Sequence, residues 1–79
     1  MRNEDLFFWN NAAPFVPYRI RLNSGRTYDI RHPEMVKIGR SSFIIFTFVG
    51  EDPNTWEKAE MLSVVLIESI EPAPLMRSA

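Results

Sequence analysis

The clearest regular pattern in the chain is an alternation of apolar and polar residues on either side of a short polar loop. Every second residue of 18–22 is apolar, and residues 27–31 repeat this alternation, which is typical of half-buried β-strands. The intervening Asn23-Ser24-Gly25 has the length and the final glycine of a three-residue hairpin loop. We therefore predict an antiparallel hairpin with these cross-strand partners: Leu22–Arg26, Ile20–Tyr28, Tyr18–Ile30 and Arg19–Asp29.

A run of mostly apolar residues, Phe43–Val49, is apolar on both faces of an extended chain. Such a run indicates a central strand covered on both sides. We expect one face to form the core, and the other to be covered by an N-terminal helix or by a second subunit. Before this run, His32-Pro33-Glu34-Met35 interrupts the sheet, because proline lacks a ladder donor. The remaining pattern predicts strands at 36–38, 56–62 and 67–71 and a helical turn at 63–66.

The first seventeen residues predict a short helix followed by an extended lead-in. Asn3 is the expected N-cap, acidic residues follow it, and Pro14 ends the helix. A helix this short is not stable alone, so its apolar block must pack on something. That block, Leu6-Phe7-Phe8-Trp9, either closes the open end of the domain or contacts a neighbouring chain or a membrane surface. The scarcity of basic residues around it disfavours anionic lipid.

A short helix followed by closely spaced short strands predicts an all-β, five-stranded small barrel of the Sm-like or SH3-like type. Residues 1–17 are the helix and lead-in, 18–72 the barrel, and 73–79 a frayed tail of the same single domain. Two stretches, Leu22-Asn23-Ser24-Gly25 and Val65–Pro72, resemble the turn after the first strand and the closing strand of the Sm-like family. That family includes the bacterial host-factor RNA chaperone. The resemblance implies rings in which strands of adjacent protomers pair edge to edge.

Other residues depart from the Sm-like pattern. Ser63-Val64-Val65 stand where the host-factor chaperone has a Tyr-Lys-His that reaches RNA, and His32-Pro33-Glu34 stand where the family has base-holding Asp and Asn residues. The resemblance therefore implies the fold without the usual uridine pocket. The segment Pro14–Leu22, with Gly25-Arg26 and His32-Pro33-Glu34 after it, also resembles small bacterial and environmental proteins of unknown function.

Composition narrows the function class. The chain has 79 residues, one histidine and no cysteine, so we expect one domain with no disulfide. No nucleophile–base constellation, metal-ligand spacing or phosphate-binding glycine loop stands out, and we predict no enzyme, no metal and no cofactor. No apolar run approaches the length of a membrane span, so we expect no membrane partner and a cytoplasmic location.

Charge is unevenly distributed along a chain whose net charge is −1. Residues 19–40 carry six basic and two acidic residues, a net of +4, and residues 51–71 carry six acidic and one basic, a net of −5. Both segments are read either as ordinary solvated strand faces or as the two ends of a polar molecule. The candidate nucleic-acid-binding residues are the basic residues that could line one surface: Arg19, Arg21, Arg31, Lys37 and Arg40.

We expect a homo-oligomer, because a chain this small carries more large apolar residues than its core needs. A ring would repeat the arginines around one face and so raise affinity for RNA. The function expected is a non-enzymatic, Sm-like binding protein with RNA as its candidate ligand; the alternative is an assembly module with no nucleic-acid role. The candidate interface residues are Leu6, Phe7, Phe8, Trp9, Ile44, Phe46 and Phe48.

Overall fold

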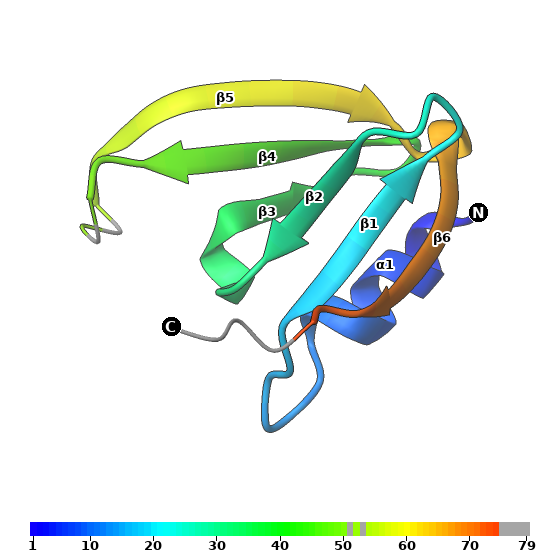
Figure 1. Ribbon diagram of the computed structural model, residues 1–79, viewed down its shortest axis with the longest axis horizontal. Coiled ribbons are helices and arrows are strands. Elements are labelled where there is room, and N and C mark those ends of the chain that lie inside the picture. The colour runs from blue at the N-terminus through cyan, green and yellow to red at the C-terminus, as the bar shows by residue number, and fades with distance from the viewer. Residues whose placement is uncertain (51, 53, 75–79) are drawn as a thin grey trace.

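The computed structural model describes residues 1–50, 52 and 54–74, and it places their strands in two three-stranded antiparallel sheets (Figure 1). The first sheet has the order β2-β1-β6, and the second has the order β3-β4-β5. The strands are β1 (Tyr18–Leu22), β2 (Thr27–Ile30), β3 (Val36–Ile38), β4 (Ser42–Phe48), β5 (Trp56–Ser63) and β6 (Ile67–Pro72). The helical segments are α1 (Asn3–Asn10), η1 (Pro33–Met35) and η2 (Val64–Leu66).

The predicted β1–β2 hairpin is confirmed in both its loop and its register. Tyr18 pairs with Ile30, Arg19 with Asp29 and Ile20 with Tyr28. The loop closes at Gly25, whose φ of +96° lies in the region that favours glycine over other residues. The hairpin forms because its apolar residues all reach one face, where they join the core, while its charged residues reach the other.

The elements after the hairpin also follow the sequence pattern closely. η1 interrupts the sheet at Pro33, so the chain passes from β2 into β3, and the described residues form six strands rather than five. β4 is central in its sheet, between β3 and β5. The prediction of a mostly β domain with a short N-terminal helix is therefore confirmed. Of the predicted frayed tail, residues 75–79 lie outside the described residues.

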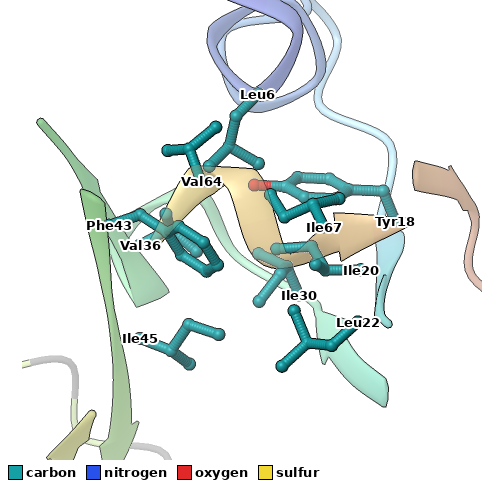
Figure 2. Packing of buried hydrophobic residues seen from close by; sticks show 10 residues of the cluster. All are labelled: Leu6, Tyr18, Ile20, Leu22, Ile30, Val36, Phe43, Ile45, Val64 and Ile67. Atoms are coloured by element: carbon teal, nitrogen blue, oxygen red, sulfur yellow. The ribbon is translucent and has the colours of Figure 1, made fainter. Parts of the chain in front are cut away.

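The core lies between the two sheets and is closed at one end by α1. Leu6 of α1 is fully buried and points toward Tyr18 and Val64 (Figure 2). The core residues are Leu6, Tyr18, Ile20, Leu22, Ile30, Val36, Phe43, Ile45, Val64 and Ile67. The helix therefore packs on its own domain through two residues of the apolar block, the buried Leu6 and the half-buried Trp9.

The expected N-cap at Asn3 is wrong, because the helix is capped one residue earlier, at Arg2. The backbone N–H of Arg2 donates to Asp5 Oδ2 at 3.1 Å, which satisfies the start of the helix. Asn3 instead donates its side-chain amide to the carbonyl of Gly39 at 3.2 Å. This bond attaches the start of α1 to the end of β3.

Candidate interaction surface

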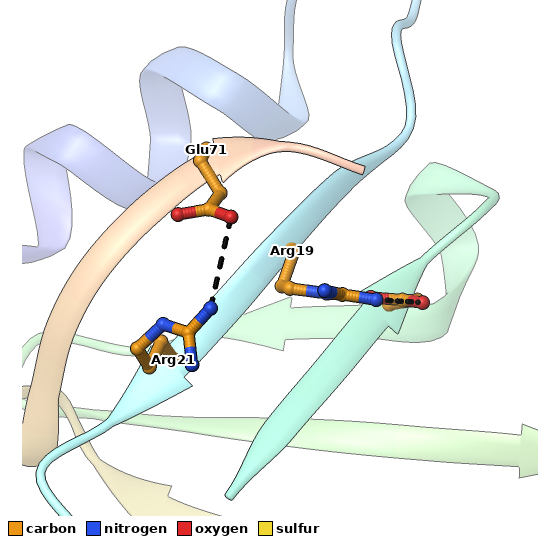
Figure 3. Close-up of polar contacts among 4 residues, drawn as sticks. Arg19, Arg21 and Glu71 are labelled. Atoms are coloured by element: carbon orange, nitrogen blue, oxygen red, sulfur yellow. Dashed lines mark hydrogen bonds and ion pairs between the residues drawn. The ribbon is translucent and has the colours of Figure 1, made fainter. Parts of the chain in front are cut away.

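The two arginines of β1 lie on the outward face of the first sheet, within a row of acids. The register places Arg19 between Asp29 of β2 and Glu71 of β6. Arg19 donates through Nε to Asp29 Oδ1 at 2.7 Å and through Nη2 to Oδ2 at 3.1 Å, and Arg21 Nη2 lies 3.8 Å from Glu71 Oε2 (Figure 3). Two acids thus balance two arginines, which leaves this face without excess positive charge.

The Arg19–Asp29 pair also changes the acid–base behaviour of both groups. The hydrogen bond from Arg19 holds the pKa of the Asp29 carboxyl below its ordinary value. The same bond raises the pKa of the Arg19 guanidinium. Both groups therefore stay charged at neutral pH and bind each other.

The other three candidate basic residues lie elsewhere. Lys37 pairs with Ile44 and is exposed on the outward side of the second sheet, whereas Arg31 follows β2 and Arg40 lies in the turn after β3. Arg31 lines a surface hollow of about 640 Å³ that also carries Asp29 and Glu34. The structure therefore distributes the predicted nucleic-acid residues over both sheets and two connecting segments.

The second sheet has an apolar outward face, which we call the outer face. Its residues on β4 alternate along the strand with the buried residues Phe43 and Ile45. The strand register places them beside residues of β5 on the same face. The apolar members of the outer face are Ile44, Phe46, Phe48, Trp56, Ala59 and Met61, and Lys37 of β3 lies beside Ile44 at its margin. Three of the predicted interface residues belong to it: Ile44, Phe46 and Phe48.

Aromatic rings lie close together on the outer face, at the end of β4 and the start of β5. The rings of Phe46 and Phe48 stack with their centroids 6.5 Å apart, and the Trp56 ring lies 6.2 Å from that of Phe46. Trp56 is nevertheless 58% exposed and Met61 67% exposed. Trp56 and Met61 stay exposed with α1 in place, so the helix does not cover them, whereas Phe46 and Phe48 are half-buried. The second face of β4 was expected to be covered either by the N-terminal helix or by a second subunit. Among the described residues, α1 does not cover it fully.

The two edges of the second sheet differ. α1 lies along β3, since Asn3 binds the carbonyl of Gly39 after that strand and Asn10 donates to the carbonyl of Pro33 before it, each at 3.2 Å. At the other edge, β5 pairs only with β4 among the described strands. The outer face thus continues to a long free edge, and such an edge presents backbone donors and acceptors to another chain.

The inward side of β5 is attached to the first sheet by a polar contact. Tyr28 Oη and Arg26 Nη2 each donate to Glu60 Oε2 at 2.9 Å. The Tyr28 hydrogen bond, followed by that from Arg26, holds the pKa of Glu60 below its ordinary value. Burial and this bond raise the pKa of Tyr28. The contact holds β5 in place and leaves its outward side and its edge available.

Sequence reasoning missed Trp56, Met61 and Glu60 as members of this region. The strand 56–62 itself was predicted. Its position at the edge of the sheet was not, because the order of strands in space, where β5 pairs only with β4 among the described strands, does not follow from the pattern within one strand. Of the predicted α1 residues, Phe7 and Phe8 are exposed, Trp9 is half-buried and Leu6 is buried in the core.

Comparison with protein-family models, with curated proteins and with solved structures finds no match to this chain. Within the described ranges, no three His, Cys, Asp or Glu side chains gather as metal ligands. The one α-helix described there is too short and too polar to cross a membrane.

Proposed function

We propose that the protein is a non-enzymatic, homo-oligomeric binding module built on an Sm-like small barrel. The strand orders support the barrel: β6-β1-β2 continues through η1 into β3-β4-β5, so the two sheets follow each other as one strongly bent sheet would. In this reading β2, η1 and β3 are a single kinked strand of a five-stranded, partly open barrel.

The observation that carries the proposal is the outer face, where Trp56 and Met61 are exposed on a strand with a free edge and the three β4 residues are half-buried. Fully burying a side chain of the size of Met or Phe contributes about 1.5–3 kcal/mol, which is a large gain for a small domain. Large apolar side chains contiguous on one exposed face are typical of an interaction site rather than of a solvated surface. A second copy is the partner that supplies a matching apolar surface.

The basic residues support RNA binding less strongly than the outer face supports assembly. Arg31, Lys37 and Arg40 make no ion pair within the described residues and remain available to phosphates. Arg19 is held by Asp29 through two hydrogen bonds, and Arg21 lies 3.8 Å from Glu71, so acids offset part of the basic surface expected for RNA. The geometry therefore supports self-assembly best, with RNA binding as an additional role of the assembled form.

The test is the mass of the protein on a sizing column with light scattering, recorded for the wild type and two variants. Met61→Lys places a charge on the outer face, and Val65→Lys is the matched control, because Val65 is 71% exposed and lies on η2. We expect the wild type and Val65→Lys to elute at a multiple of 9.2 kDa and Met61→Lys to elute as a protomer. A wild type that is monomeric at micromolar concentration contradicts the proposal.

The same column run tests the RNA role through absorbance at nucleic-acid and protein wavelengths. Nucleic acid that elutes with the assembly, and that is lost in a Lys37→Ala/Arg40→Ala variant of unchanged mass, supports RNA binding. An assembly free of nucleic acid, which also fails to bind added single-stranded RNA at low salt, assigns the module to assembly alone.

A further inference from the structure

The free edge of β5 indicates how two copies meet. β5 is among the longest strands described here, and its only described neighbour is β4. We infer that β5 pairs with β5 of a second copy, antiparallel, around a two-fold axis that passes beside Ala59. This inference rests on the proposed self-association and specifies the contact that carries it. The pairing joins two second sheets into one continuous sheet.

The charges on β5 select the register. In an antiparallel pair, opposite residues share a face, and the longest overlap of β5 with itself is obtained with the axis at Ala59 or at Glu60. The register shift between Trp56 and Lys58 places Glu57 and Trp56 outside the regular alternation, so the charges of residues 58–60 decide between the two axes. An axis at Glu60 places two Glu60 carboxylates directly opposite each other, which is destabilising. An axis at Ala59 places Lys58 opposite Glu60 on both sides of the axis, which is stabilising.

The side chains needed for this contact are available on the right face. Lys58 pairs with Thr47 and Glu60 with Ile45, so both lie on the inward side of the sheet. Lys58 makes no ion pair in the part of the chain that the structure describes. Tyr28 and Arg26 both bind Glu60 Oε2, so Oε1 can accept from Lys58 of the second copy.

The outer face also fits this arrangement. Ala59 and its neighbour across the strands, Phe46, lie on the outer face. A small residue at the axis lets the two strands approach, and the two outer faces then lie on the same side of the joined sheet. Met61, two residues from Ala59 on the same face, then lies at the seam between the copies, so the pairing covers this part of the outer face.

Pairing between β5 and β6 of different copies, the head-to-tail alternative that makes rings, is disfavoured by the same charges. β5 contributes Glu57 and Glu60, and β6 contributes Glu68 and Glu71, against Lys58 alone. β6 also ends at Pro72, which lacks a backbone donor. The two-fold arrangement avoids this accumulation of acids and closes on itself.

The absence of cysteine permits a direct test by single-cysteine cross-linking. Across the proposed axis, two copies of residue 59 have Cα atoms about 4.5–5.5 Å apart, within the reach of a disulfide. Two copies of residue 60 are about 8 Å apart, which is beyond that reach. We therefore compare Ala59→Cys with Glu60→Cys under a mild oxidant, at a protein concentration where both have the mass of the assembly, because Glu60→Cys also removes the carboxylate that binds Tyr28 and Arg26. The covalent dimer is followed on a non-reducing gel.

We expect Ala59→Cys to form a reducible covalent dimer about tenfold faster than Glu60→Cys, because only the first pair is within disulfide reach. A faster Glu60→Cys reaction overturns the register. No cross-link from either variant, in a protein that still has the mass of an assembly, overturns the β5–β5 pairing and leaves the proposed function standing. A wild type with the mass of a protomer overturns both.

Discussion

The buried hydroxyl of Tyr18 gives the sharpest test of how α1 is attached to the sheets. Tyr18 is fully buried, and its Oη donates to Asn10 Oδ1 at 2.8 Å. The Asn10 amide donates in turn to the carbonyl of Pro33 at 3.2 Å, so this short chain of bonds joins β1, α1 and η1. Burial raises the pKa of the Tyr18 hydroxyl, which therefore keeps its proton and remains the donor.

Tyr18→Phe removes this donor and keeps the ring that packs against Trp9 and Phe15, each 6.0 Å away between centroids. Asn10 Oδ1 is then buried without a partner, which costs about 1–3 kcal/mol of the free energy of unfolding. A chain of this length has about 4–12 kcal/mol in total, so the loss is large. The melting temperature is expected to fall by about 4–8 °C for each kcal/mol lost.

The assay is urea unfolding followed by tryptophan fluorescence, at a protein concentration where every variant has the same mass. Tyr28→Phe is the matched control, because it also deletes one tyrosine hydroxyl that donates a single hydrogen bond. In the control the acceptor is the carboxylate of Glu60, which is more accessible than Asn10. We expect the control to lose less stability than Tyr18→Phe. A Tyr18→Phe protein within about 0.5 kcal/mol of wild type, or a control that loses more, refutes the argument that this bond attaches the helix.

Three further outcomes are expected in unfolding experiments. Leu6→Ala, at a fully buried position, should cost about 2–5 kcal/mol in urea unfolding, and a cost below about 1 kcal/mol would show that α1 is not part of the core. Gly25→Ala should lower the free energy of unfolding by about 1–2 kcal/mol, because φ at this position is +96°. Equal melting temperatures for the wild type and Gly25→Ala would argue against this loop conformation. Because the folded-state pKa of Asp29 is lowered below 3.8, its ion pair with Arg19 stabilises the protein fully above that pH and is lost as the pH falls through the lowered value. Asp29→Asn should therefore flatten the acid branch of the stability curve, and an unchanged branch would contradict this.

Local patterns sufficed for the parts of the fold whose partners are close in sequence. The β1–β2 register followed from the alternation around Asn23-Ser24-Gly25, because one hairpin loop fixes which residues meet. The interruption at Pro33 and the turn before Ile67 followed from residue types alone. The N-cap did not, because Asp5 can cap the backbone of Arg2 just as Asn3 could cap its own turn.

The candidate site was only partly predictable, because it depends on which strands lie at edges. The apolar residues of β4 indicated an unmatched face, and the sequence could not show that α1 lies along β3 and leaves β5 free. The basic residues illustrate the same limit. Their proximity in sequence suggested one surface, whereas the alternation of strand faces and the pairing of Arg19 with Asp29 separate them.

Hydrogen exchange of the β5 amides at two protein concentrations tests most directly whether β5 and the outer face carry self-association. The amides that point away from β4 are free in the protomer and bonded in the assembly, whereas those of β1 are paired on both sides within the protomer. We predict that protection of peptides covering residues 56–63 increases with concentration while that of residues 18–22 does not. Equal protection of residues 56–63 at concentrations on either side of assembly would contradict the account.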